Sequence, residues 1–181
     1  QELHRKADVA LYHAKMAGRR RFSIFGNQMD DAIQSRAAIE ADLREALKSK
    51  TGLSVVYQPK FASQCGRILG AEALVRWQHP QQGSISPAVF IPIAEEANLI
   101  GDLGLWVLET ACREAISWPV DHLAVNVSPL QLRAPGFAEA VFAVLSRTGF
   151  AASRLELEMT ETDFADSEEV GISNIRTLNS R

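Results

Sequence analysis

Strand-like and helical segments alternate after residue 50, and this alternation limits the fold more than any other feature of the chain. Strands are expected at 53–60, 69–77, 123–128 and 155–160, and helices at 30–49, 87–118, 137–148 and 168–179. The long helical region at 87–118 is expected to be broken at Pro92 and Gly101. Only a turn at 65–67 separates the first two strands, so we expect them to form an antiparallel hairpin. Each later strand follows a helix, which indicates a parallel sheet with crossover helices. This α/β pattern corresponds to about half of a closed β/α barrel.

Composition narrows the class of protein. The chain has 181 residues, of which 46% are hydrophobic and 23% charged, as in a globular domain. A net charge of −3 argues against a broad basic face for DNA or RNA. No apolar run reaches the ~18 residues of a membrane span. Cys65 and Cys112 lie far apart without nearby ligand partners, so we expect reduced cysteines and a cytoplasmic protein.

The strand at 69–77 carries an acid and a base among apolar residues. In a strand, alternate side chains share a face, so Glu72, Leu74 and Arg76 are expected to point the same way. Gly70 precedes them on this face and is expected to leave room beside the acid. Burying charged side chains on an apolar strand costs free energy unless each charge has a partner. Two explanations remain open: an internal ion pair, or a site that holds a cation and a phosphate side by side.

Two later strands also carry polar side chains near their ends. Asn126 lies on one of them and Glu158 on the other, each alternating with apolar residues. In a β/α barrel the carboxyl ends of the strands converge, so Glu72, Asn126 and Glu158 are expected to meet there. Two carboxylates and an amide oxygen form a set of hard ligands suited to Mg²⁺ or Mn²⁺. From spacing alone, ordinary buried polar networks explain the same pattern.

Four motifs in this order resemble the EAL family of cyclic-di-GMP phosphodiesterases. The motifs are Gln58-Pro59, Glu72–Trp77, Asn126–Ser128 and Glu158–Glu161, and the match runs in register from about 39 to 162. The resemblance implies a TIM-type (β/α) barrel that begins with an antiparallel hairpin. It also implies hydrolysis of cyclic-di-GMP to the linear dinucleotide with Mg²⁺ or Mn²⁺ as cofactor.

The resemblance also assigns roles to individual residues. Glu72, Asn126 and Glu158 correspond to metal ligands. Arg76 corresponds to a residue that holds a phosphate of the dinucleotide, and Gln58 to one near a nucleotide. Metal ions in such sites activate water and neutralise the phosphate during an in-line attack.

One more residue of the chain matches the family, and some catalytic residues of the family have no match. Glu161 matches a residue that braces a neighbouring loop. The aspartate pair and the catalytic lysine of the family have no counterpart before Arg181, so no catalytic residue is assigned. We therefore expect the 181-residue chain alone to be inactive and marginally stable. Two alternatives to the phosphodiesterase remain: an inactive module that senses cyclic-di-GMP, or an inactive truncated fragment.

The segment before residue 28 has a pattern of its own. A helix is expected from Glu2 to Ala17, followed by a basic run and a short strand at 22–25. This segment resembles the end of a GGDEF domain, where the residues matching Lys15 and Arg19 contact phosphates of bound nucleotide. The basic run is equally explained as a solvated helix end favoured by the helix dipole.

Together these patterns predict three parts: a GGDEF remnant at 1–27, a linker and first helix at 28–50, and part of an EAL domain at 51–181. The parent would be a tandem GGDEF–EAL protein. The resemblance is compatible with a homodimeric parent and with a membrane tether upstream. Its expected partner is cyclic-di-GMP.

Overall fold

The computed structural model describes residues 2–4, 6–7, 10–11, 22, 24–63, 66–159 and 169–180. The chain divides into two compact units, 1–43 and 44–181. In the first unit the described residues at 2–4, 6–7 and 10–11 are helical. Helix α2 (Asn27–Ser49) crosses from this unit into the second. No helix in the described ranges is long and apolar enough to cross a membrane.

The described residues of the range 22–25 do not form the strand that was expected there. These residues, Phe22, Ile24 and Phe25, have no regular secondary structure, and two of them are exposed. A strand requires a hydrogen-bonded neighbour. All strands among the described residues belong to the sheet of the second unit.

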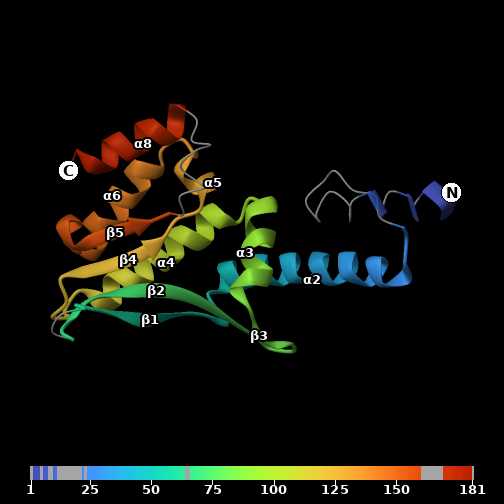
Figure 1. Cartoon of the computed structure of the whole chain (residues 1–181), viewed down its shortest axis with the longest axis horizontal. Coiled ribbons are helices and arrows are strands. Elements are labelled where there is room, and N and C mark those ends of the chain that lie inside the picture. The colour runs from blue at the N-terminus through green and yellow to red at the C-terminus, as the bar shows by residue number, and fades with distance from the viewer. Residues whose placement is uncertain are drawn as a thin grey trace. The chain divides into compact units, whose positions relative to one another are not determined.

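The second unit is built on one mixed sheet (Figure 1). Its strands are β1 (Leu53–Phe61), β2 (Ile68–His79), β3 (Gly83–Ile85), β4 (His122–Asn126) and β5 (Leu155–Glu158). The order is β1-β2-β4-β5, and the short β3 pairs with β2. The β1–β2 hairpin is antiparallel, as expected, and β2, β4 and β5 run parallel. Consecutive parallel strands are neighbours, which fits a partial β/α barrel.

The helical region expected at 87–118 is two helices. These are α3 (Pro87–Glu96) and α4 (Ile100–Ala115). We expected breaks at Pro92 and Gly101, and this was wrong, because Pro92 lies inside α3 and Gly101 inside the first turn of α4. The chain turns at Asn98 instead, whose φ of 55° is in the left-handed region that asparagine tolerates.

The remaining helical elements are α5 (Pro129–Leu132), α6 (Phe137–Thr148), the 3₁₀ turn η1 (Ala152–Arg154) and α8 (Glu169–Asn179). Strand β4 ends at Asn126, before the predicted end at Ser128, because Ser128 has become the N-cap of α5. Strand β5 is described to Glu158, and Thr160 lies outside the described residues. The strand β3 was not expected from the sequence.

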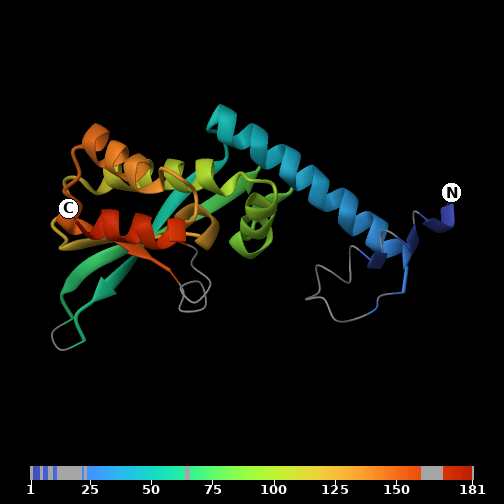
Figure 2. The same cartoon turned by 90° about the horizontal axis from the view of Figure 1, so that it is seen from above.

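The core lies between the sheet and its helices. On β2, Ala71, Ala73 and Trp77 are buried, and on β4 Leu123 and Val125 are buried. Helix α4 packs against β4 and β2, and α6 packs against α4 (Figures 1 and 2). Apolar residues of α6 recur at helical spacing and are buried: Phe137, Val141, Val144 and Leu145. The alternate residues of β2, including Glu72, therefore point to the opposite face of the sheet.

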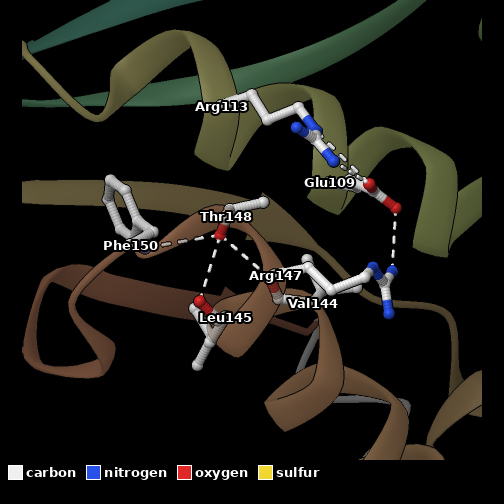
Figure 3. Close-up of polar contacts among 7 residues, drawn as sticks. All are labelled: Glu109, Arg113, Val144, Leu145, Arg147, Thr148 and Phe150. Carbon is white, nitrogen blue, oxygen red and sulfur yellow. Dashed lines mark hydrogen bonds and ion pairs between the residues drawn. The ribbon is translucent and has the colours of Figure 1, made fainter.

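An ion-pair network joins α4 to α6 (Figure 3). Glu109 Oε1 accepts hydrogen bonds from Arg113, at 2.6 Å from Nη2, within α4. Its Oε2 accepts from Arg147 Nη2 of α6 at 2.8 Å. The hydrogen bond from Arg147 and then that from Arg113 lower the pKa of Glu109 to about 2. One carboxylate thus serves two guanidinium groups from two helices.

The end of α6 is closed by its own side chains. Thr148 Oγ1 donates to the carbonyl of Val144 at 2.9 Å, and the amide of Phe150 donates to Thr148 Oγ1 at 3.3 Å (Figure 3). Gly149 has a φ of 72°, which glycine adopts without strain at a helix end. The chain then enters the turn that leads into β5.

We expect Glu109→Gln to lower the free energy of unfolding by about 1 kcal/mol at pH 7, since it removes two partly exposed ion pairs. The pKa of Glu109 is depressed in the folded state, so this stability is present above the unfolded pKa of about 4.5. It decreases as the pH falls from there towards 2. Urea unfolding at pH 7 and pH 3.5 measures both effects. Exposed Glu45→Gln on α2 is the control, and an equal loss in both variants would contradict the prediction.

Candidate functional site

Four strands of the sheet bring polar side chains to the face that points away from α4. Gln58 of β1 is directly opposite Glu72 of β2, and Asn126 of β4 is the register partner of Glu158 of β5. Directly opposite residues share a face, with Cβ atoms about 5 Å apart. The antiparallel hairpin and the parallel pairs therefore assemble these side chains from distant parts of the chain.

Glu72 and Asn126 are in direct contact across two strands. Asn126 Nδ2 donates a hydrogen bond to Glu72 Oε1 at 2.6 Å. Among the described residues, no three His, Cys, Asp or Glu side chains cluster closely enough to hold a metal ion. A metal here would depend on the carbonyl oxygen of Asn126 in addition to the carboxylates of Glu72 and Glu158. These oxygen ligands fit Mg²⁺ or Mn²⁺.

Lys60 is a member of this polar face that the sequence analysis missed. Its ammonium donates a hydrogen bond to Glu158 Oε1 and lies 3.6 Å from Glu156 Oε2. The hydrogen bond to Glu158 raises the pKa of Lys60, and partial burial offsets part of that effect. His122 Nδ1 also lies 3.4 Å from Glu156 Oε1. Lys60 follows Gln58 by two residues on a strand, and that spacing was the available signal.

A cavity of about 640 Å³ lies at the end of β4, between β2 and the helices α3, α4 and α5. Arg76 and Asn126 line it, together with Glu95 of α3 and Ser128. The rest of its wall is mostly apolar and comes from β2, the residue after β4, and the helices α3, α4 and α5. Arg76 is half-buried and donates through Nη1 to the carbonyl of Val75 at 2.8 Å. The cavity thus combines the Arg76 guanidinium, the Glu95 carboxylate and a mostly apolar wall, and the guanidinium is the group in it that can hold a phosphate attached to a larger organic group.

Hydrogen bonds hold the segment that follows Asn126. Ser128 Oγ donates to Glu95 Oε1 at 2.7 Å, which links this segment to α3. The amide of Ser128 donates to Gln131 Oε1 at 3.0 Å, as part of a capping box at the start of α5. The amide of Val127 donates to the carbonyl of Glu158 at 2.9 Å. The backbone on both sides of Asn126 is therefore fixed, which orients its side chain towards Glu72.

Comparison with known families decides the assignment. The family model described as "EAL domain" matches residues 40–181. The chain belongs to the EAL family.

Several relatives of this EAL domain are longer signalling proteins. The whole chain is 44% identical over 98% of its length to an uncharacterized signaling protein of Caulobacter vibrioides, of which it covers 22%. It is 41% identical over 89% of its length to the bifunctional diguanylate cyclase/cyclic di-GMP phosphodiesterase MucR of Pseudomonas aeruginosa, of which it covers 24%. The chain thus spans less than a quarter of either relative.

A solved structure of the MucR phosphodiesterase in complex with c-di-GMP has a similar fold. The TM-score is 0.73 with 36% sequence identity, and the match covers 79% of this chain and 60% of that one. The mixed α/β fold of this EAL domain is therefore shared with a solved relative.

The structure of this EAL domain brings together Glu72, Asn126, Glu158 and Gln58, and places Arg76 at the adjoining cavity. The internal ion pair considered for Glu72 and Arg76 is not the arrangement found for these residues. Glu72 accepts a hydrogen bond from Asn126, and Arg76 donates one to the backbone carbonyl of Val75. Three predicted residues lie outside the described ranges: Lys15, Arg19 and Glu161. The link between Ser128 and Glu95 was not anticipated.

We expect Gly104→Ala to destabilise this EAL domain by about 1–2 kcal/mol. A Cβ at Gly104 of α4 would lie 1.9 Å from Nε2 of buried Gln131, whose side chain would have to leave its capping bond to Ser128. Thermal unfolding measures the loss. Gly101→Ala, in the same helix with no atom within 4 Å of its Cβ, is the matched control and is expected to be neutral or stabilising. Equal stability of the two variants would contradict the prediction.

Proposed function

We propose that this EAL domain supplies metal and substrate ligands for the hydrolysis of cyclic-di-GMP to the linear dinucleotide. The observation that carries the proposal is the direct contact of Glu72, within β2, with Asn126 at the end of the neighbouring parallel strand β4, where Asn126 is also the register partner of Glu158. Support comes from the MucR phosphodiesterase, which has been solved in complex with c-di-GMP. We assign this activity to the whole protein, since the chain spans less than a quarter of the relatives reported above.

In this proposal Glu72, Asn126 and Glu158 hold Mg²⁺ or Mn²⁺ through oxygen atoms. The metal, when bound, supplies a positive charge that activates water and neutralises phosphate. Arg76 places its guanidinium against a phosphate of the substrate, and Gln58 lies near a nucleotide. During the reaction a water oxygen bonds to phosphorus and the bond from phosphorus to one ribose oxygen breaks. That ribose oxygen takes up a proton.

The proposal extends to the organisation of the chain. We keep the predicted parts 1–27, 28–50 and 51–181 as a GGDEF remnant, a linker and an EAL portion. MucR supports this arrangement, because its name describes both a diguanylate cyclase and a phosphodiesterase. The proposed contacts of Lys15 and Arg19 with nucleotide phosphates, and of Glu161 with a neighbouring loop, belong to the same proposal.

The metal ligands are tested by calorimetric titration of cyclic-di-GMP into the chain, with and without Mn²⁺. We expect tighter binding with Mn²⁺, and Glu72→Ala should weaken that metal-dependent binding at least about tenfold. Glu139→Ala, an exposed acid on α6, is the matched control and should bind like the wild type. Binding that is equal with and without Mn²⁺ would reject the metal site. In the longer protein, Glu72→Ala should lower the formation of linear dinucleotide at least about 100-fold.

The phosphate contact is tested separately. We expect Arg76→Ala to weaken cyclic-di-GMP binding at least about tenfold, because a charged hydrogen bond to phosphate contributes about 1.5–3 kcal/mol. Mn²⁺ affinity, measured in the absence of the dinucleotide, should stay within about twofold, since Arg76 is not a ligand of the metal. If Arg76→Ala lost Mn²⁺ binding and kept its affinity for cyclic-di-GMP, the proposed phosphate contact would be wrong.

A further inference from the structure

We propose that the ammonium of Lys60 competes with the divalent cation for Glu158, so that Lys60 sets the metal affinity of the site. The inference rests on the proposed metal site. It concerns a residue to which the motif comparison assigns no role.

The first observation is the place of Lys60 in the sheet. Lys60 is on β1 and its carboxylate partners are on β5, with β2 and β4 between these strands. Neighbouring strands are about 4.8 Å apart, so the outer pair would be about 14 Å apart in a flat sheet. The hydrogen bond from Lys60 to Glu158 therefore requires this face of the sheet to be concave. Lys60 extends into the concave face, over which the site residues lie.

The second observation is the space that Lys60 crosses. Its register partner on β2 is Gly70, so no side chain rises there beside the lysine. A Cβ at Gly70 would lie 2.6 Å from the carbonyl oxygen of His122 on β4. The structure thus adds a second reason for glycine here to the expected room beside Glu72. Glycine here allows β2 and β4 to approach, and leaves the path from Lys60 to β5 open.

The third observation is which atoms Lys60 engages. It holds Oε1 of Glu158, a carboxylate that is the register partner of metal-ligand candidate Asn126. A cation that binds Glu158 must therefore share or displace the ammonium. A second carboxylate, Glu156, is on the same face of β5, and its Oε2 lies 3.6 Å from the ammonium. Glu156 can therefore hold the ammonium of Lys60 when Glu158 binds a metal ion. The lysine side chain and the Glu158 side chain are 35% and 37% exposed, so both have room to move.

The charges around Lys60 are consistent with an exchange in which a metal ion takes the place of the ammonium at Glu158. Glu156 and Glu158 face it from β5, Glu72 lies on the intervening strand β2, and His122 of β4 lies 3.4 Å from Glu156. Among the described residues, Lys60 is the ammonium that contacts both Glu156 and Glu158 when no metal is bound. Removing Lys60 therefore removes the competitor and leaves the carboxylates to a divalent ion.

The experiment is calorimetric titration of Mn²⁺, without nucleotide, into wild type, Lys60→Met, Lys60→Arg, Arg67→Met and Glu72→Gln. Lys60→Met should bind Mn²⁺ at least about fivefold more tightly than wild type, because a partly exposed ion pair no longer opposes the metal. Lys60→Arg keeps the cation and should stay within about twofold of wild type. Arg67→Met removes one positive charge from the same hairpin, where Arg67 pairs with Asp121, and should also stay within about twofold.

Thermal unfolding provides a second measurement that does not depend on activity. Mn²⁺ should raise the Tm of Lys60→Met more than that of wild type, since tighter binding to the folded state gives more stabilisation. Equal Mn²⁺ affinity in wild type and Lys60→Met, or an equal gain in Arg67→Met, would overturn the role of Lys60. If Glu72→Gln loses Mn²⁺ while Lys60→Met is unchanged, the metal site stands and only this inference fails. Absence of Mn²⁺ binding in all variants would reject both.

Discussion

The register of the parallel strands is the constraint on which the rest of the domain depends. Because side chains alternate, the pairing that buries Ala71 and Ala73 under α4 also turns Glu72 to the other face. A slip of one residue would bury the carboxylate and expose the alanines. The same pairing places Asn126 beside Glu158. Core packing and site assembly are therefore set by one set of backbone hydrogen bonds.

The sequence predicted this part of the molecule because period-two alternation is a local signal. The hairpin, the parallel pairing of the later strands and the approach of Asn126 to Glu72 all agree with the structure. The break between α3 and α4 was misplaced, because proline and glycine are weak signals inside a helix whose packing compensates for them. Asn98, which makes the turn, carries little signal of its own.

The contacts missed from sequence share a different physical basis. Lys60 meets Glu158 across the sheet, and Ser128 meets Glu95 of a separate helix. Both pairs depend on where side chains end after the strands curve and the helices pack. Residue spacing along a strand predicts the face of a side chain and not its partner. Such contacts therefore become visible only when the whole sheet is assembled.

The junction of α4 and α6 has a consequence for how sequences of this kind diverge. One carboxylate at position 109 serves Arg113 and Arg147 together. A basic residue at position 109 alone would bring three positive charges together at this junction, and their repulsion would weaken the packing of α4 against α6. We therefore expect positions 109, 113 and 147 to covary in related domains, with neutral residues replacing all three at once where the network is lost.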